Sequence, residues 1–191
     1  MNFLAHIYLS GTDEELMIGN FIADFVKGKK KDLYPDRIRK GIELHRAIDD
    51  FTDHHPVTEE SKARLRPLYG KYSGVIVDLY YDHFLAANFS MFSEESLVDY
   101  SAKTYASIKK YEAVLPEGVL FFLPYMIERN WLLNYATIEG VGRALSGLST
   151  RVSFENKMNE SVNELRQYYP LFENEFHRFF PELITFATSK I

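Results

Sequence analysis

The sequence predicts an all-α protein, and three observations support this fold class. Alternating apolar and polar residues, which mark half-buried strands, are hard to find, whereas apolar residues recur with the helical period of 3.6 from end to end. Caps, glycines and prolines bound these periodic segments at helical spacings. The 191 residues, 46% of them hydrophobic, are sufficient for the core of one domain. We therefore expect a single helical bundle over residues 1–191, without repeats or linkers.

Capping signals define the first two predicted helices. A helix is expected over residues 12–26, because Thr12 and Glu15 form a capping box at its start. The lysines of residues 29–31 then form a loop. A second helix is expected over residues 35–52, since a proline fits its first turn.

Two helices of opposite character follow. Residues 58–69 predict a polar helix that ends at Gly70, and residues 73–89 predict a strongly apolar one. Eight of the eleven side chains between residues 75 and 85 are apolar or aromatic. The few polar side chains of this helix are therefore expected to point inward.

The second half of the chain predicts further helices. They cover residues 93–111, 118–135, 137–148 and 156–169, before a last helical segment. Pro124 should kink the second of these helices, and Pro181 should break the last segment. Residues 156–191 match no motif, and we interpret them as helical packing.

Composition excludes several function classes. The 22 basic and 27 acidic residues give a net charge of −5, which argues against a nucleic-acid-binding surface. The absence of cysteine excludes disulfides, thiolate nucleophiles and cysteine-based metal sites, and favours a reducing compartment. The longest uncharged apolar stretch, residues 119–127, is half of the roughly 20 residues that a membrane span needs. A signal peptide would need basic residues ahead of its apolar run, and the N-terminal segment has none. We therefore expect a cytoplasmic protein that does not bind membranes. The sequence does not predict its oligomeric state.

The apolar helix over residues 73–89 carries three polar residues that need compensation. Asp78 and Asp82 are four residues apart and share one face, while His83 follows directly. Two inward carboxylates repel each other, and this helix holds no lysine or arginine to neutralise them. A bound cation would resolve the conflict.

Other helices offer ligands of the same kind. His45 and Asp49 are neighbours on the inner face of the second helix, and Asn20 and Asp24 are four apart in the first. His6 lies in an apolar N-terminal segment. Histidine and carboxylate ligands without thiolates suit Mn, Fe, Mg or Zn used for hydrolysis. Alternatives are a local His45–Asp49 hydrogen bond, an Asp24–lysine ion pair and a histidine satisfied within the core.

Five motifs, in this order along the chain, resemble the acyl carrier protein phosphodiesterases. They are Asn2-Phe3-Leu4-Ala5-His6, Gly19-Asn20-Phe21-Ile22-Ala23-Asp24-Phe25-Val26, Gly41-Ile42 with His45-Arg46-Ala47-Ile48-Asp49, Thr52-Asp53, and Asp82-His83-Phe84. This family resembles the all-helical HD-domain phosphohydrolases in an atypical form; the adjacent pair here, Asp82-His83, has the reverse order of the usual His-Asp. The resemblance implies hydrolysis of the phosphodiester between 4′-phosphopantetheine and a serine of acyl carrier protein. It also implies a divalent ion, usually Mn²⁺, with Fe²⁺, Mg²⁺ or Zn²⁺ as alternatives.

On this interpretation each polar residue receives a role. The expected metal ligands are His45, Asp78, Asp82 and His83, with Asp24 as a further ligand or the residue that orients the attacking water. Arg46 would hold the phosphate, although a surface ion pair is an equal alternative for it. Asp49 or His6 would orient a ligand or donate a proton to the leaving serine oxygen.

A basic segment bears on the partner. Against two acidic residues it holds seven basic ones, a local balance of +5: Lys27, Lys29, Lys30, Lys31, Arg37, Arg39 and Lys40. Because acyl carrier proteins are acidic, this segment could dock one; a solvated loop and helix face is the alternative.

Two other functions stay open at this point. An HD-type phosphohydrolase could act on a nucleotide or another small phosphate ester. A helical interaction module without a metal is the third hypothesis.

Overall fold

The computed structural model describes residues 1–152, 154 and 156–191, and every regular element in these residues is helical. The α-helices are α1 (Phe3–Tyr8), α2 (Glu14–Ile22), α3 (Asp36–His54), α4 (Pro56–Tyr69), α5 (Ser73–Ala87), α6 (Leu97–Lys110), α7 (Glu117–Glu128), α8 (Trp131–Asn134), α9 (Ile138–Ser149), α10 (Val162–Gln167) and α11 (Tyr169–Thr188). Short 3₁₀ helices lie between them, at Ala23–Phe25, Gly28–Leu33, Gly70–Tyr72, Phe89–Met91, Glu112–Val114 and Met158–Glu160. The predicted all-α class is confirmed.

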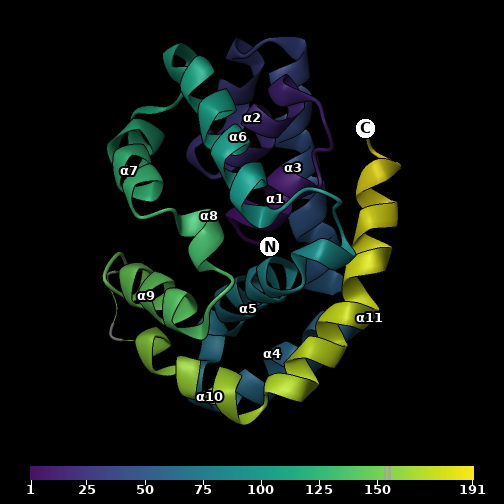
Figure 1. The fold of residues 1–191 in the computed structure, drawn as a ribbon, viewed down its shortest axis with the longest axis vertical. Coiled ribbons are helices and arrows are strands. Elements are labelled where there is room, and N and C mark those ends of the chain that lie inside the picture. The colour runs from purple at the N-terminus through teal and green to yellow at the C-terminus, as the bar shows by residue number, and fades with distance from the viewer. Residues whose placement is uncertain (153, 155) are drawn as a thin grey trace.

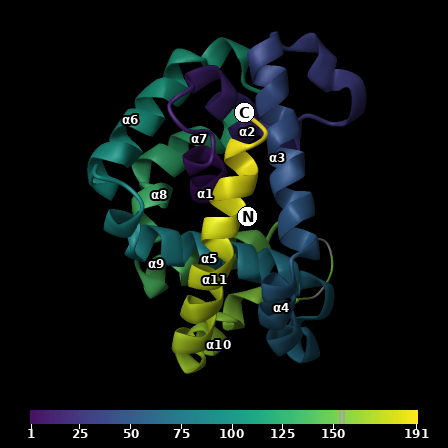
Figure 2. The same cartoon turned by 90° about the vertical axis from the view of Figure 1, so that its right-hand side faces the viewer.

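Helix α5 lies at the centre of the bundle (Figure 1). It contacts α1, α4, α9 and α11, and its side chains are buried almost all round, as its apolar sequence predicts. Helix α11, yellow in Figure 1, runs along one edge, while α7, α8 and α9 lie on the opposite side. Figure 2 shows α11 crossing in front of α5, with α3 beside it. The polar side chains of α5 are therefore surrounded by other helices.

Helices α2 and α3 touch through their backbones. A Cβ atom on Gly19 would lie 1.9 Å from the carbonyl oxygen of Ile38, and one on Gly41 would lie 2.1 Å from that of Leu16. Only glycine fits at both positions. This contact fixes the distance between the two helices that carry Asn20 and His45.

A partly buried ion pair joins α4 to α11. The guanidinium of Arg64 donates two hydrogen bonds, of 2.8 and 2.6 Å, to Glu175, whose side chain is buried. The hydroxyl of Ser61 donates to the same carboxylate and lies 2.9 Å from the hydroxyl of Tyr81. Such a pair costs desolvation but is strongly destabilising to break.

In the first half, α3, α4 and α5 lie where predicted, and Gly70 ends α4 with a φ of 51°. The predicted N-cap Thr12 is wrong: Asp13 caps α2, because its carboxylate accepts the N–H of Leu16 at 2.9 Å. Helix α2 also ends at Ile22, earlier than predicted. Helix α1 has no counterpart in the prediction, and the lysines at 29–31 lie in a 3₁₀ helix instead of an irregular loop.

In the second half, α9 is confirmed and several boundaries differ. Helix α6 begins at Leu97, with Ser96 as its cap. The predicted helix over residues 118–135 divides into α7 and α8 at Asn130, which has a φ of 43° and caps α8 through its side chain. In place of the predicted helix over residues 156–169, the chain forms a 3₁₀ turn and the short α10 before α11 begins at Tyr169.

Helix α11 continues through Pro181, against the prediction of a break. Phe179, Phe180 and Leu183 on either side of this proline are buried. An interior proline costs about 3 kcal/mol, and burial of this face outweighs that cost. None of the described helices combines the length and apolar composition needed to cross a bilayer.

Candidate metal centre

Two histidines and a carboxylate from two helices meet beneath the surface of the bundle. The ligand atoms of His6, on α1, and of His45 and Asp49, both on α3, all lie within 4.8 Å of one another. The Nε2 atom of His45 is 3.1 Å from Asp49 Oδ2, and the Nε2 atom of His6 is 3.2 Å from Asp49 Oδ1. The two imidazole rings stack with centroids 3.8 Å apart. Asp24 completes the group, with its Oδ1 3.2 Å from His45 Nε2.

Backbone and amide groups hold both histidines in place. The Nδ1 atom of His45 is 2.8 Å from the carbonyl oxygen of Asn20, so an N–H there directs Nε2 toward the carboxylates. The side-chain amide of Asn20 donates to the carbonyl of His6 at 2.7 Å and to the hydroxyl of Ser10 at 3.0 Å. Asn20 therefore ties α1 to α2 and positions both rings.

The two histidines of the cluster differ strongly in their pKa values. Burial lowers the pKa of His45, but Asp24 and Asp49 outweigh burial and raise this pKa to about 9. Burial, together with the charge of His45, lowers the pKa of His6 to about 4. The pKa of Asp49 is lowered because its close contacts with both imidazoles and the nearby α-amino group outweigh its burial. At neutral pH the cluster thus holds a proton on His45 between two carboxylates.

His6 gives the strongest indication that a cation belongs here. Its side chain is buried, and within the described residues neither of its ring nitrogens has a hydrogen-bond partner in suitable geometry. A buried nitrogen without a partner is costly. Two imidazole nitrogens and carboxylate oxygens form a donor set that suits a divalent ion such as Mn²⁺, Fe²⁺ or Zn²⁺. The residues present therefore fit a metal.

Asp78 lies next to this cluster. Its Oδ1 is 3.0 Å from the α-amino nitrogen of Met1, which is also 3.4 Å from Asp49 Oδ1. Burial raises the pKa of Asp78, while the α-amino group opposes that effect. The structure thus brings Asp78 to the edge of the site, in the lining of the same cavity as Asp24 and Asp49.

Asp82 and His83 lie elsewhere. The buried carboxylate of Asp82 accepts the backbone N–H groups of Asn2, Leu4 and Ala5, at 3.3, 2.8 and 3.2 Å. Burial nevertheless raises the pKa of Asp82 to about 7. Asp82 therefore stabilises the start of α1.

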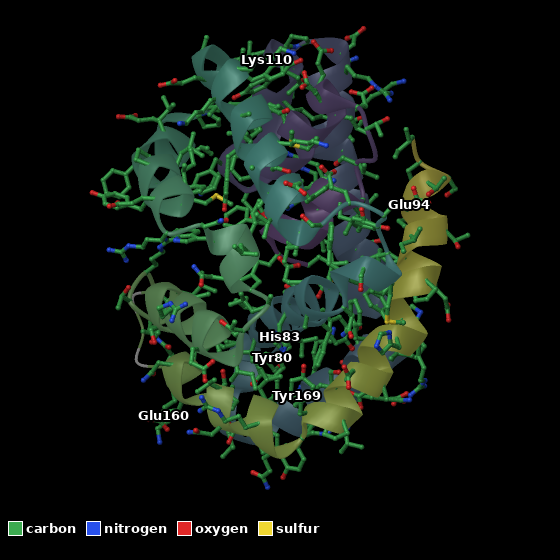
Figure 3. The ribbon with its side chains drawn as sticks, in the orientation of Figure 1. Tyr80, His83, Glu94, Lys110, Glu160 and Tyr169 are labelled. Atoms are coloured by element: carbon green, nitrogen blue, oxygen red, sulfur yellow. The ribbon has the colours of Figure 1, made fainter. Side chains whose placement is uncertain are left out.

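His83 faces away from α1. Its Nδ1 is 2.7 Å from the carbonyl oxygen of Tyr135, and its Nε2 is 3.0 Å from the hydroxyl of Tyr169. Figure 3 labels His83 close to Tyr80 and Tyr169. Consecutive residues of a helix point about 100° apart, so Asp82 and His83 do not reach one site together. Their assignment as metal ligands stays a prediction that the structure does not favour.

The basic residues that were predicted to bind phosphate or the carrier differ in their contacts. Arg46 donates to the carbonyl of Val26 at 3.0 Å, which secures the turn after Asp24. Three of the predicted docking residues pair with carboxylates: Lys31 with Glu43, Arg37 with Asp13, and Arg39 with Asp36. Lys27, Lys29, Lys30 and Lys40 are exposed.

Two cavities open beside the site. One, of about 350 Å³, is lined by carboxylates, among them Asp24, Asp49, Asp53 and Asp78. The other, of about 410 Å³, is largely aromatic and shares Asn2 and Leu148 with the first. The sequence shows only one part of the wall of this second cavity, the apolar stretch over residues 119–127. The cavity itself was therefore not predicted.

The chain is similar to known proteins along its length. The family model described as acyl carrier protein phosphodiesterase matches residues 1–183. Similar proteins named acyl carrier protein phosphodiesterase occur in Klebsiella pneumoniae strain 342, with 30% identity over 193 residues, and in Enterobacter sp. strain 638, with 29% identity over 194 residues. Each alignment covers 100% of this chain and 99% of the relative. No solved structure matches, so the expected HD-domain likeness stays a prediction.

Proposed function

The chain belongs to the acyl carrier protein phosphodiesterase family, and on that basis we propose that it hydrolyses the phosphodiester between 4′-phosphopantetheine and a serine of acyl carrier protein. Water adds to phosphorus, the bond from phosphorus to the serine oxygen breaks, and that oxygen takes up a proton. The products are the apo-protein and 4′-phosphopantetheine. A cytoplasmic location belongs to the same proposal.

We assign the metal site to the cluster around His6. His6, His45 and Asp49 would hold a divalent ion, with Asp24 on its open side. A bound divalent ion supplies Lewis acidity, which offsets charge on the phosphoryl oxygens and makes water more acidic. The observation that carries this assignment is the close approach of these three side chains around buried His6, whose Nδ1 has no partner among the described residues and whose Nε2 has only the 3.2 Å contact with Asp49 Oδ1. Asp82 and His83 take structural roles in this proposal.

The chain's own residues divide the remaining work. Asp24, whose side chain is 70% exposed, faces the cavity beside His45 and is placed to orient water or accept its proton. Asp49 keeps both imidazoles aligned. The carboxylates around this cavity repel a phosphodiester, so the substrate can enter only when a cation balances their charge. With a pKa of about 4, His6 is a poor proton donor at neutral pH, which favours a ligand role over an acid role for it.

The proposal is tested with holo-acyl carrier protein, Mn²⁺ and intact-mass detection of the apo-protein. Wild type should remove the phosphopantetheine, and Asp49→Asn should lose nearly all turnover because a ligand charge is gone. Asp50→Asn is the matched control, since Asp50 follows on the same helix, is 79% exposed and, within the described residues, pairs only with His54. Wild-type turnover in folded Asp49→Asn would contradict the ligand assignment. Parallel assays with nucleotides separate this activity from that of a general phosphohydrolase.

The basic segment belongs to this proposal as a docking surface for the acidic carrier. Lys29 and Lys30 are exposed, and no carboxylate of the described residues lies within ion-pair distance of either. The double variant Lys29→Glu/Lys30→Glu should lower kcat/KM for holo-acyl carrier protein several-fold at low salt, and the effect should fade as salt increases. Lys109→Glu/Lys190→Glu, which changes two other exposed lysines, is the control. Equal kcat/KM for both double variants and wild type would remove the docking role.

A further inference from the structure

The largely aromatic cavity beside the metal centre is the strongest unexplained feature of the molecule. It lies among α7, α8, α9 and the N-terminal residues, and has a volume of about 410 Å³. Phe122 and Trp131 form a stacked pair in its wall, with centroids 5.8 Å apart, and Phe3 packs on Phe122 at 5.6 Å. Phe121 and Tyr125 extend the wall outward and are 76% and 49% exposed. The volume falls within the roughly 300–1,000 Å³ of small-molecule sites.

This cavity lies next to the acidic one. Asn2 and Leu148 line both cavities, and the side-chain amide of Asn2 is 3.4 Å from the hydroxyl of Tyr135. The shortest way from the carboxylates to the aromatic cavity thus runs past Asn2, which lines both. Apart from three arginines, the polar side chains that line the aromatic cavity, among them Asn134 and Thr150, are amides and hydroxyls without formal charge.

Three arginines, Arg129, Arg143 and Arg151, surround the aromatic cavity. Within the described residues, none of them has a carboxylate within 4 Å. Six other arginines do have one: Arg37, Arg39, Arg64, Arg66, Arg166 and Arg178. Arg143 instead donates to the amide oxygen of Asn134 at 2.9 Å, and Arg151 lies 5.8 Å from the ring centroid of Trp131. The mouth of the cavity is therefore positive and can attract an anionic partner.

From these features, and resting on the proposed function, we propose that the aromatic cavity binds the pantetheine arm while the three arginines bind acidic side chains of the carrier protein. The arm is a chain of two amides, a hydroxyl and a dimethyl branch that ends in a thiol, and it carries no formal charge when the thiol is protonated. Such a chain matches aromatic walls with a few amide and hydroxyl groups. The scissile phosphate would then lie at the junction of the two cavities. Charge complementarity selects the acidic carrier as the partner at the mouth.

Gly147 provides a variant that blocks the cavity without disturbing the fold. It lines the cavity, and a Cβ atom added there meets nothing within 4 Å. Gly147→Phe should lower kcat/KM for holo-acyl carrier protein at least about tenfold, because the arm loses its position. Hydrolysis of bis(p-nitrophenyl) phosphate, which has no arm, should stay within about twofold of wild type. Gly147→Ala, the matched control, should behave as wild type with both substrates.

The arginines are tested by Arg143→Gln, with Arg166→Gln as the control because Arg166 pairs with Glu139 outside the cavity. Arg143→Gln should raise KM for holo-acyl carrier protein several-fold at low salt and leave kcat unchanged. An unchanged KM would remove the arginines from the proposal. Wild-type kcat/KM in Gly147→Phe would overturn the cavity assignment.

Trp131 gives a readout that does not depend on turnover. It is the single tryptophan of the chain and lines the cavity, so its fluorescence reports occupancy. Titration with pantetheine should change the emission of wild type and Gly147→Ala, and should leave that of Gly147→Phe unchanged. If wild type fails to cleave holo-acyl carrier protein, the proposed function fails, and this titration still decides the cavity: no change in wild-type emission would then overturn it.

Discussion

Binding of a divalent ion should displace one proton from the cluster, and this proton belongs to His45. The pKa of His45 is about 9, so the imidazole is almost fully protonated at pH 7. Metal ligation needs the neutral ring. Displacing a proton two pH units below its pKa weakens apparent binding about 100-fold, or about 2.7 kcal/mol. His6, with a pKa of about 4, is already neutral and contributes nothing to this linkage.

Calorimetry of Mn²⁺ binding in buffers of different ionisation enthalpy measures the proton directly. At pH 7 we expect release of about one proton per ion, and an affinity that rises about tenfold per pH unit up to about pH 9 and then levels off. Asp24→Asn should reduce the release at pH 8, because one of the two carboxylates that raise the pKa of His45 is lost. His54→Gln, an exposed histidine on the same helix, should change nothing.

Two results would refute this reasoning. One is Mn²⁺ binding at pH 7 with the same heat in every buffer. The other is an affinity that does not change between pH 6.5 and pH 9. Either would mean that the ion does not replace the proton of His45.

Three further predictions concern stability. Since the pKa of His45 is about 9 in the folded protein and ordinarily about 6.5, the metal-free protein should be most stabilised by this group below pH 6.5, and its melting temperature should fall as pH rises to 9. Asp82→Ala should lower the free energy of urea unfolding by about 3 kcal/mol, because it leaves backbone N–H groups of α1 without partners. Glu175→Gln should cost about 3 kcal/mol by leaving the charge of Arg64 uncompensated, whereas the more exposed Glu182→Gln should cost less than about 1 kcal/mol.

The sequence predicts those helices that are specified by their own residues, through caps and apolar periodicity. Helix α3 combines a starting proline with an inward stripe, and its i, i+4 pair, His45 and Asp49, lies as close as predicted, at 3.1 Å. Helix α5 follows from its apolar run. Helix α1, with six residues, carries no signal of its own, and so the approach of His6 to α3 could not be predicted.

The site depends on contacts between helices, which the apolar periodicity of the sequence does not predict. The approach of Asp24 to His45 depends on the backbone contact at Gly19 and Gly41, which is a tertiary feature. Asp78 and Asp82 share a face of α5, but helical spacing does not show which backbone donors face a carboxylate. The N–H groups at the start of α1 satisfy Asp82 without any cation.

The carboxylate of Asp82 also determines the order in which the site can assemble. A helix of six residues is not stable alone in water, and the start of α1 is held by a side chain 78 residues from Leu4 in sequence. Helix α1 can therefore form only after α5 has taken its place. A nascent or partly unfolded chain presents His45 with Asp49 but lacks His6, so it offers a cation only two adjacent groups. Only the fully folded protein would therefore bind an ion tightly. Binding of the ion would in turn stabilise the folded state over partly folded states.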